Sequence, residues 1–380
     1  ERKAAKQSEV AKRKKVYYVS NTGTSTGGTS SKNPMSYEAA NKTTFHSGDT
    51  ILFKRGEDYY GAFNPTIKQV DDSVTIVSAY GEGERPNILG YKIANSEESW
   101  ELDEEGIYKI NLTDPQRFTG LMTTDANSVN IGFLEDSNGV KCYNKVGTKE
   151  ELVNPFDFYC DETYLYIKCD ENPYKKLGEL KLATKTNLFY MHSNMRIKNL
   201  RVAGTGAHGL LAADATTKNV EISYNLIEDI GGSFLKGTTR YGNGIEFYGT
   251  DTSDIVVKNN MIRNIYDVAF TIQGTKGSGT NVLVRNNVFV ANTQDSEIWE
   301  SEEATGIQGY NFTKNISVNQ GRGWGYEARP DKYPAAHILF WSYLFEDTDI
   351  CFSYNKVYNP RRLYFVEQSS GTNILFQETD

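Results

Sequence analysis

The chain of 380 residues contains few cysteines, and their spacing does not match a zinc site. The four are Cys142, Cys160, Cys169 and Cys351. No two of them are separated by only two residues, so we expect no structural metal, and a chain of this size does not need a disulfide framework. One disulfide stays open as an alternative, because Cys160 and Cys169 flank residues 161–168 and a hairpin there would bring them together.

Long apolar runs are also absent. No stretch reaches the roughly 18–20 residues of a transmembrane helix, so we expect no membrane span. The charged opening, residues 1–15, does not have the pattern of a signal peptide, and we expect a solvated tail or a short helix there. The P-loop, the glycine pattern of dinucleotide-binding folds, the G-x-S-x-G elbow and the H-E-x-x-H zinc motif are all missing.

Positive charge is in deficit, with a net charge of −8 and a pI near 5.3. A nucleic-acid partner would require a basic surface to neutralise phosphates, so we expect none. A polyanionic substrate is disfavoured too, unless a local basic patch or a bound cation compensates. Aromatic residues, in contrast, make up 12% of the chain, with 25 tyrosines. Such rings suit the face of a sugar as well as they suit a β core.

The second half of the chain contains an internal repeat. Six segments alternate apolar and polar residues around one asparagine, at Asn199, Asn225, Asn260, Asn287, Asn315 and Asn355. Successive asparagines are 26, 35, 27, 28 and 40 residues apart. A short base period with two longer gaps is typical of a solenoid whose coils carry loop insertions. Asparagine favours turns and can hydrogen-bond along stacked strands, so we expect a turn ladder at these positions.

A second alternating segment follows each asparagine. These segments are 208–214, 243–249, 268–274, 296–302, 336–342 and 362–368. Period-two alternation predicts strands, and runs with helical periodicity are scarce. One short coil cannot bury its own inner face, so the coils must stack on each other. The sequence therefore predicts an all-β protein with the architecture of a parallel β-helix.

The first half departs from this rhythm, and we expect four segments along the chain. They are a charged tail at 1–15, an N-terminal cap with the first coils at 16–94, an inserted antiparallel β subdomain at 95–185, and the main β-helix with the active groove at 186–380. The insertion either forms a wall of the groove or gives only structural support. The sequence stops within a rung, which would leave an open strand edge exposed. Two alternatives stay open: the chain is a trimmed piece of a longer one, or a further domain or subunit covers this end.

Period two also assigns faces to the second-segment strands. With the bulky apolar residues pointing inward, three rows of side chains should point outward. These rows are Glu246, Thr271, Glu297 and Leu339; Tyr248, Gln273, Trp299 and Trp341; and Gly244, Ala269, Asp295 and His337. Adjacent exposed aromatics usually mark a binding surface, so we expect a sugar-binding groove here. The alternative is that the insertion covers these aromatics as a second core.

Carboxylates on this face provide hydrolytic chemistry. Glu246 and Glu297 are two rungs apart, roughly 9–10 Å at about 4.8 Å per rung. Inverting glycosidases hold their two carboxyl groups about 6.5–9.5 Å apart, and side chains can lean together. Asp267 and Asp295 are further candidates for the acid or base. Each of these acids also has an ordinary alternative role as a solvated surface carboxylate.

Two long insertions in the repeat should form the lips of the groove. The first, between Asn225 and Asn260, brings Lys236, Arg240 and Tyr241 beside Glu246. A polysaccharide lyase would use such a lysine, arginine or tyrosine as its base, so β-elimination is an alternative chemistry. The second insertion precedes Asn355 and should form the opposite lip, where His337 is a binding candidate. It brings Arg322, Trp324, Glu327, Arg329 and His337 there.

These residues resemble the pectate-lyase-like superfamily of right-handed parallel β-helix proteins, which contains polysaccharide lyases and several families of glycoside hydrolases. The similar segments are 17–24, 158–174, 240–249, 264–274 and 296–300. The resemblance covers about 16–375. It implies a right-handed helix, a groove along the parallel strands, and an extracellular, cell-surface or periplasmic bacterial enzyme acting on glycans. Calcium-dependent pectate lyases stack aspartate ligands, and the chain shows no obvious cluster of this kind.

The expected function is glycoside hydrolysis of an oligo- or polysaccharide, with Glu297 and Glu246 as the acid–base pair and Asp267 as substitute partner. The groups expected to bind sugar are Tyr248, Trp299 and Trp341 by stacking, and Arg240 and Gln273 through hydroxyls. A lyase or uronate epimerase, and a non-catalytic glycan-binding β-helix, are the alternatives. We expect no cofactor, apart from calcium if the chain is a lyase.

Overall fold

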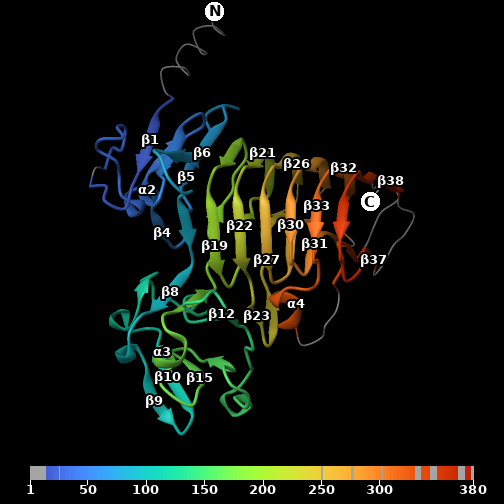
Figure 1. Ribbon diagram of the computed structural model, residues 1–380. Coiled ribbons are helices and arrows are strands. Elements are labelled where there is room, and N and C mark those ends of the chain that lie inside the picture. The colour runs from blue at the N-terminus through green and yellow to red at the C-terminus, as the bar shows by residue number, and fades with distance from the viewer. Residues whose placement is uncertain are drawn as a thin grey trace, which may run out of the picture.

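The computed structural model describes residues 14–24, 26–249, 251–274, 278–301, 303–329, 335–342, 349–366 and 373–377. Three long parallel sheets form a β-helix, with small antiparallel sheets attached (Figure 1). The predicted all-β architecture and parallel β-helix are therefore confirmed. Most of the tail expected at 1–15 lies outside the described residues, as do 378–380 at the other end. No described helix is long and apolar enough to cross a membrane.

From β17 (Phe189–Tyr190) to β37 (Tyr364–Val366) the chain adds one strand to each of the three sheets in turn, whereas the first coils add strands only to the ten- and eight-stranded sheets. The ten-stranded sheet contains, in spatial order, β1 (Val16–Val19), β3 (Thr50–Lys54), β6 (Thr75–Tyr80), β18 (Met195–Lys198), β21 (Thr216–Ser223), β26 (Asp251–Lys258), β29 (Ser278–Arg285), β32 (Gly306–Thr313), β35 (Asp349–Ser353) and β38 (Asn373–Gln377). The eight-stranded sheet contains β36 (Lys356–Tyr358), β33 (Ile316–Val318), β30 (Val288–Val290), β27 (Met261–Ile265), β22 (Leu226–Ile230), β19 (Arg201–Thr205), β7 (Asn87–Leu89) and β4 (Asp58–Tyr60). The seven-stranded sheet contains β17 (Phe189–Tyr190), β20 (Leu210–Ala212), β25 (Ile245–Gly249), β28 (Val268–Gly274), β31 (Gln294–Glu300), β34 (Ile338–Ser342) and β37 (Tyr364–Val366).

The smaller elements lie at the N-terminal end, in the insertion and beside the coils. They are β2 (Thr44–His46) with β5 (Thr66–Lys68), β23 (Ser233–Lys236) with β24 (Thr239–Tyr241), and the short helices α2 (Tyr37–Lys42), α3 (Pro173–Leu177) and α4 (Trp324–Glu327). Single 3₁₀ turns occupy Glu97–Ser99, Pro115–Arg117 and Lys149–Glu151. These helices are too short to be stable alone and depend on packing against the sheets.

An asparagine ladder holds the corner between the ten- and eight-stranded sheets. The side-chain Oδ1 of Asn260 accepts the backbone N–H of Asn225 at 2.9 Å, and Asn287 does the same for Asn260 at 3.0 Å. Asn315 and Asn355 continue the series, and each Nδ2 donates to a backbone carbonyl of the preceding coil. The predicted turn ladder is confirmed at these five positions, and it satisfies buried polar groups that would otherwise cost stability.

The first asparagine of the repeat is not a member of this ladder. Leu200 occupies the ladder position of its coil and donates its N–H to Asn225 Oδ1 at 3.0 Å. Asn199 lies one residue earlier, with φ +62°. In the later coils that left-handed corner is taken by Tyr224, Asn259 and their equivalents. The expectation for Asn199 was wrong by one residue, because asparagine suits both the ladder and the left-handed corner before it.

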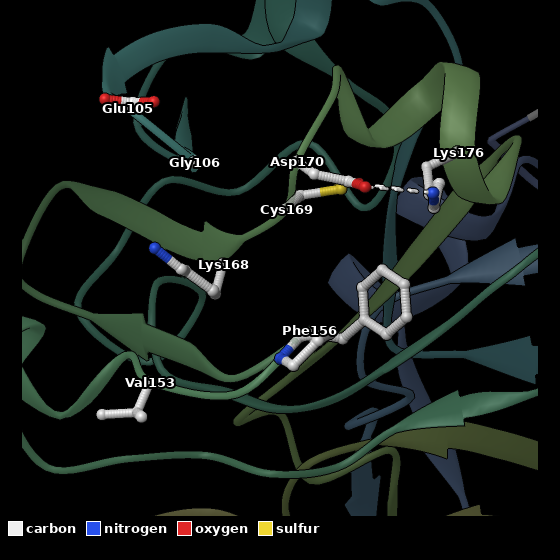
Figure 2. A pocket seen from close by; sticks show the side chains of 9 residues that line it. Glu105, Gly106, Val153, Phe156, Lys168, Cys169, Asp170 and Lys176 are labelled. Carbon is white, nitrogen blue, oxygen red and sulfur yellow. Dashed lines mark hydrogen bonds and ion pairs between the residues drawn. The ribbon is translucent and has the colours of Figure 1, made fainter.

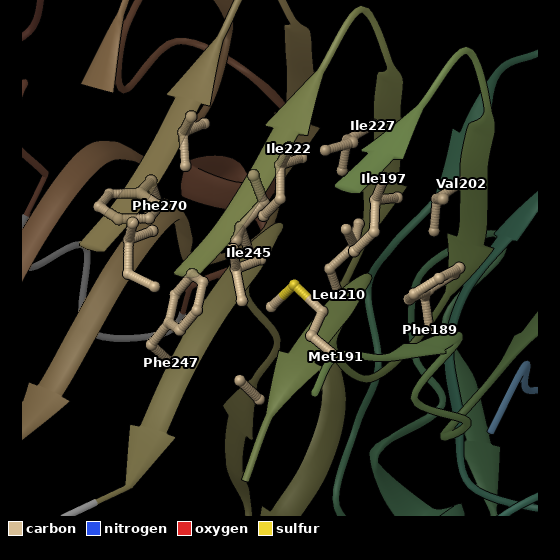
Figure 3. Close-up of a cluster of buried hydrophobic side chains, with 14 of the residues drawn as sticks. Phe189, Met191, Ile197, Val202, Leu210, Ile222, Ile227, Ile245, Phe247 and Phe270 are labelled. Carbon is tan, nitrogen blue, oxygen red and sulfur yellow. The ribbon is translucent and has the colours of Figure 1, made fainter. Parts of the chain in front are cut away.

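The interior of the β-helix is a continuous apolar core. Side chains such as Phe189, Ile197, Ile222 and Phe247 stack coil upon coil (Figure 3). Burying one such side chain contributes roughly 1.5–3 kcal/mol, so the stacked rows supply much of the stability of the coils. The rows also fix the register of the seven-stranded sheet, since a shift by one residue would expose them.

Antiparallel strands interrupt the coils between β7 and β17, as expected for the inserted segment. One sheet contains β11 (Thr119–Gly120), β8 (Tyr91–Ala94), β16 (Leu180–Thr184), β12 (Ile131–Glu135) and β13 (Lys141–Cys142), and the other β14 (Phe158–Cys160), β15 (Tyr164–Lys168), β10 (Ile107–Asn111) and β9 (Glu101–Glu104). They enclose a second apolar core. All four cysteines are free, and Cys160 lies opposite Leu165 in the hairpin, so the alternative disulfide to Cys169 does not form.

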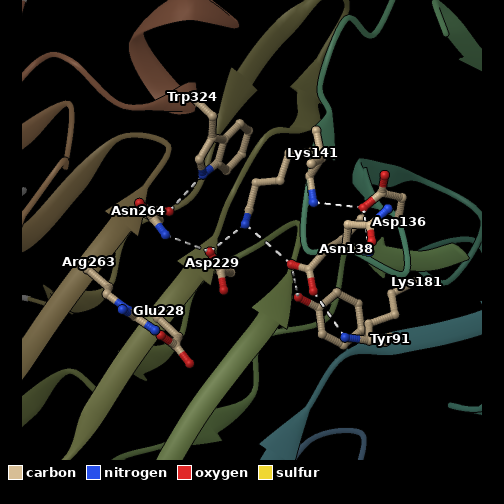
Figure 4. Close-up of polar contacts among 12 residues, drawn as sticks. Tyr91, Asp136, Asn138, Lys141, Lys181, Glu228, Asp229, Arg263, Asn264 and Trp324 are labelled. Carbon is tan, nitrogen blue, oxygen red and sulfur yellow. Dashed lines mark hydrogen bonds and ion pairs between the residues drawn. The ribbon is translucent and has the colours of Figure 1, made fainter. Parts of the chain in front are cut away.

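A buried charge network joins the insertion to the β-helix (Figure 4). Lys141 Nζ lies 2.7 Å from Asp229 Oδ1 and 3.3 Å from Glu135 Oε2, and Lys181 Nζ lies 3.0 Å from Glu135 Oε1. Burial raises the pKa of Asp229, while the Lys141 ammonium opposes that rise. Removing one member of such a network leaves an uncompensated charge, so the contact fixes the insertion in one place.

Candidate functional site

The outer face of the seven-stranded sheet carries a cavity of about 510 Å³. It is lined by Asn187, His208, Leu211, Ala213, Leu235, Thr239, Arg240, Tyr241, Asn243, Glu246, Tyr248, Asp267 and Gln273. Six of the residues expected at the site from the sequence lie in this lining. All of the lining comes from the coils and the β23–β24 hairpin, and the hairpin is held from behind by Asn130 of the insertion, whose Nδ2 donates to Phe234 O at 2.9 Å. The insertion therefore supports the wall of the cavity.

The register of β25, β28 and β31 agrees with two of the three expected rows. Glu246 pairs with Thr271, which pairs with Glu297. In the other row Tyr248 is 46% exposed and Trp299 is half-buried, so the insertion does not cover these rings as a second core. The backbone of Trp341 pairs with Trp299, but its side chain lies outside the described part of the chain.

Glu297 is the most perturbed acid of this face. Its Oε2 accepts a hydrogen bond from Thr271 Oγ1 at 3.0 Å and another from Gln273 Nε2 at 3.2 Å. Burial, followed by the negative charge of Asp267, raises the pKa of Glu297 to about 8, although the two hydrogen bonds oppose the rise. A carboxyl group in this state carries a proton at neutral pH and can donate it.

Asp267 stands at the start of β28 and forms an ion pair with Arg329. The Arg329 guanidinium also lies 5.2 Å from the centre of the Tyr266 ring. Arg329 comes from the second long insertion of the repeat, directly after α4. Asp267 therefore connects the cavity lining to a segment that is far away in the sequence.

Glu246 is paired with a histidine that the sequence reasoning did not single out. His208 Nδ1 lies 2.6 Å from Glu246 Oε2, and Asn243 Nδ2 donates to the same oxygen at 3.2 Å. The Tyr241 ring meets the His208 ring edge-on at 5.0 Å. Glu246 is 4% exposed. Its contacts and its burial therefore leave its side chain less freedom to move than the side chain of Asp267 has.

The first long insertion contributes mainly structure. Arg240 is buried, and its guanidinium donates to the carbonyl oxygens of Gly232, Tyr143, Ala328 and Gly132. Four of the five N–H donors of Arg240 are used in this way, so at most one is left for the substrate hydroxyls that it is predicted to hold. Burial lowers the pKa of Arg240 to about 10 and raises that of Tyr241. Lys236 is exposed, outside the cavity lining.

Asp295 and His337 are in the interior, which contradicts their expected outward position. His337 Nδ1 lies 2.8 Å from Asp295 Oδ2, and the His337 ring packs edge-on against Phe312 of the core. Asp295 also accepts hydrogen bonds from Ser317 Oγ and from Asn292 Nδ2. The backbone N–H groups of Asp295 and Ser296 both donate to His337 O, at 3.2 and 3.0 Å. This two-against-one pairing is a bulge, and it turns the row inward against the alternation.

Trp324 also has a different role from the one expected. It lies in α4, is 8% exposed, and packs against Phe133 and Tyr266. Its indole Nε1 donates to Asn264 O at 2.9 Å (Figure 4). Because the ring is used to pack the insertion against the coils, it does not stack on a sugar.

A larger cavity, of about 740 Å³, lies in the insertion (Figure 2). Its walls include Val153, Phe156 and Cys169, with Lys176 ion-paired to Asp170 at its edge. The acids in this lining are Glu105 and Asp170; Asp170 is 78% exposed and ion-paired with Lys176, and the lining contains no histidine. We therefore place the candidate active site at the smaller cavity, which is lined by two carboxylates, Glu246 and Asp267, and by His208. Glu297 is not part of the lining, but it is hydrogen-bonded to Gln273, which is.

Two residues of the cavity region escaped the sequence reasoning. His208 and Asn243 precede the alternating parts of β20 and β25, and extending the register two residues backward would have placed them side by side. Arg329 was expected on the opposite lip, but its ion pair with Asp267 could not be predicted, because it comes from an insertion that has no register with the coils. Among the described residues, no cluster of three His, Cys, Asp or Glu side chains could hold a metal ion.

Comparison with known proteins gives similarity of fold. No family model matches the chain, and no curated protein matches it. The structure of XylC in complex with xylose is similar with a TM-score of 0.56 and 13% identity, covering 96% of this chain and 70% of that one. A glycoside hydrolase is similar with a TM-score of 0.52 and 9% identity, covering 96% of each chain. At such identities the chain shares its β-helix fold with these proteins, and the chemistry has to be argued from its own site.

Proposed function

We propose that this chain is a glycoside hydrolase in which Glu297 is the general acid. The observation that carries the proposal is the environment of Glu297, which is hydrogen-bonded to Thr271 and Gln273 and lies near the negative charge of Asp267. Burial and that charge raise the pKa of Glu297 to about 8, which favours the protonated acid at neutral pH. A glycosidase needs one carboxyl group that still holds its proton near neutral pH, beside a second that is ionised. Glu297 next to Asp267 meets this requirement.

Asp267 is the better partner for Glu297 than Glu246. Asp267 lines the cavity, its side chain is 26% exposed, and Arg329 balances its charge. In the proposed reaction Glu297 gives its proton to the glycosidic oxygen as the bond to the anomeric carbon breaks. Asp267 then either attacks that carbon or removes a proton from an attacking water, and the anomer formed first distinguishes these two routes.

The rest of the cavity fits a largely neutral sugar. Tyr248 and Trp299 occupy one row of the sheet beside the acids, and aromatic faces with a polar end suit pyranose rings. Gln273 stands between them. The acidic net charge of −8 disfavours a polyuronate. The similar structure that contains xylose and the similar glycoside hydrolase agree with this class of ligand.

The alternative bases for β-elimination are poorly placed. Arg240 is committed to four carbonyl oxygens, Lys236 points into solvent outside the lining, and burial raises the pKa of Tyr241. A base has to lose its proton near the working pH, and a raised tyrosine pKa opposes this. These three positions therefore favour hydrolysis over a lyase or epimerase reaction.

The test is digestion of a panel of neutral and uronic oligosaccharides by the full chain. Reducing ends and ultraviolet absorbance are both recorded, because a lyase product contains a new double bond and a hydrolase product does not. We expect new reducing ends without absorbance. Glu297→Gln should lower kcat by about 10²–10⁴-fold, the usual contribution of a general acid.

Glu221→Gln is the matched control. Glu221 has the same side chain, on the outer face of β21 in the ten-stranded sheet, where it is ion-paired with Lys258 at 3.1 Å. Its replacement should leave turnover unchanged. Wild-type turnover in Glu297→Gln would remove Glu297 from the mechanism, and an absorbing product would replace the hydrolase by a lyase.

A further inference from the structure

The contacts of His208 define which of its nitrogens is available. Nδ1 lies 2.6 Å from Glu246 Oε2 and 3.1 Å from the backbone nitrogen of Asn243. A ring nitrogen holds either a proton or a lone pair, so it cannot donate to Glu246 and accept from Asn243 at once. The contact with the carboxylate is the shorter, and a charge-assisted hydrogen bond is stronger than one to a neutral group. We therefore place the proton on Nδ1, directed at Glu246.

This placement makes Nε2 the free acceptor of the neutral ring. His208 lines the cavity, and the hydrogen bonds of its ring to the described residues are made through Nδ1. Asn187 Oδ1 accepts the backbone N–H of His208 at 3.2 Å, and the Tyr241 ring lies edge-on to the imidazole. The ring is therefore held from three sides, with its remaining nitrogen available in the same cavity as Asp267.

We propose that His208 is a substrate-recognition residue, whose Nε2 accepts a hydrogen bond from a hydroxyl group of a neutral pyranose, and that Glu246 is a positioning residue acting through it. The proposal rests on the function proposed above. It gives Glu246 a task other than acid–base catalysis, in keeping with its burial and its use of Oε2. A carboxylate that fixes the tautomer of a histidine is a recurring arrangement at functional sites.

The chain provides a matched control. His192 Nδ1 lies 2.9 Å from Asp214 Oδ2, a pair of the same chemistry, and neither residue lines the cavity. His192→Asn should therefore leave sugar binding unchanged, whereas His208→Asn should weaken it about tenfold, the effect of losing one hydrogen bond of about 1.4 kcal/mol. Glu246→Gln should give part of that loss, and the double variant no more than His208→Asn alone, because both act through one contact.

The experiment measures tautomer and binding separately on the full chain. The chain has four histidines, so their ring nitrogens can be resolved by long-range ¹H–¹⁵N NMR. We expect His208 with Nδ1 protonated and Nε2 bare, and Glu246→Gln should mix the tautomers. Xylose, glucose and galactose are then titrated as probes into Glu297→Gln, and the bound sugar should shift the His208 signals and leave those of His192 in place.

The outcomes separate this inference from the proposed function. A His208 ring protonated on Nε2, or sugar affinity within twofold of wild type in His208→Asn, overturns the inference while turnover stands. If the chain cleaves no glycan but its binding of sugar depends on His208, the recognition role stands and the hydrolase proposal is rejected. A wild-type chain that neither binds these sugars nor cleaves the panel rejects both.

Discussion

Two carboxylate–histidine pairs lie on the seven-stranded sheet, and they differ in their surroundings. Glu246 and His208 are 2.6 Å apart and open into the cavity, while Asp295 and His337 are 2.8 Å apart inside the core. Each pair joins neighbouring coils. In the inner pair, Asp295 also accepts hydrogen bonds from Ser317 and Asn292, and His337 Nε2 is buried without a hydrogen bond to the described residues. The outer pair lines the cavity instead, so its remaining imidazole nitrogen is available there. The same pair of side chains thus serves stability inside the core and recognition at the cavity. The bulge at Asp295 is the reason that the inner pair points into the core.

The largest expected effect is on stability. Asp295→Ala leaves His337, Ser317 and Asn292 without their shared partner in the core, which should cost roughly 3–5 kcal/mol of the free energy of unfolding. Glu246→Ala should cost no more than about 1 kcal/mol, because water in the cavity can reach His208. Chemical denaturation of both variants measures the difference. Equal losses would mean that the two pairs do not differ as described.

A third carboxyl group extends the comparison to an acid without a partner. Glu300 ends β31, is fully buried, and its oxygens make no hydrogen bond to the part of the chain that is described. Burial raises its pKa to about 7. Between pH 4.5 and 7 the unfolded chain therefore ionises at this residue while the folded chain keeps the proton, so stability falls as pH rises through this window.

Replacement of Glu300 by glutamine removes this pH dependence. At pH 8, Glu300→Gln should be more stable than wild type by about 2–3 kcal/mol, and near pH 4 the two should be equal. Thermal unfolding across that range measures the gap. If the difference in stability between the variant and wild type were constant with pH, or grew toward acid pH, a protonated Glu300 would be contradicted.

The smallest effect concerns Glu297, the acid that is hydrogen-bonded to Gln273 of the cavity lining. Glu297 has to be protonated to act, so kcat/KM should fall as pH rises through about 8. Thr271 donates a hydrogen bond to the Glu297 carboxylate, which favours the charged form. Thr271→Val removes this hydrogen bond and should raise the pKa of Glu297. The basic limb of the kcat/KM profile should therefore move to higher pH by about half to one unit. Thr217→Val, at a buried threonine of β21, is the control and should leave the limb in place. A limb that moves downward in Thr271→Val would reverse the assigned role.

Periodicity was sufficient to predict the coils and much of the cavity sheet. The rows containing Glu246, Glu297 and Tyr248 follow from strict alternation within strands, and the ladder follows from the spacing of Asn225 and its equivalents. Both depend on neighbours in the same strand or on identical residues one coil away, which a sequence displays directly.

Prediction failed where the backbone leaves the strand. Asp295 is turned inward by a bulge, Asn199 occupies the corner before the ladder, and Arg240 is captured by carbonyl oxygens of the distant insertion. None of these is encoded by period two. The ion pair of Arg329 with Asp267 depends likewise on how an insertion returns to the sheet.

The asparagine ladder has a consequence for how such a chain can diversify. Its two longest intervals, 35 and 40 residues, contain the β23–β24 hairpin and the segment with Arg329, and the asparagines on both sides keep their hydrogen bonds to one another. Residues can therefore be inserted or deleted between two coils without a change in the distance between acids on adjacent rungs. Proteins built this way can exchange the segments that select a sugar while inheriting the bond-breaking groups unchanged.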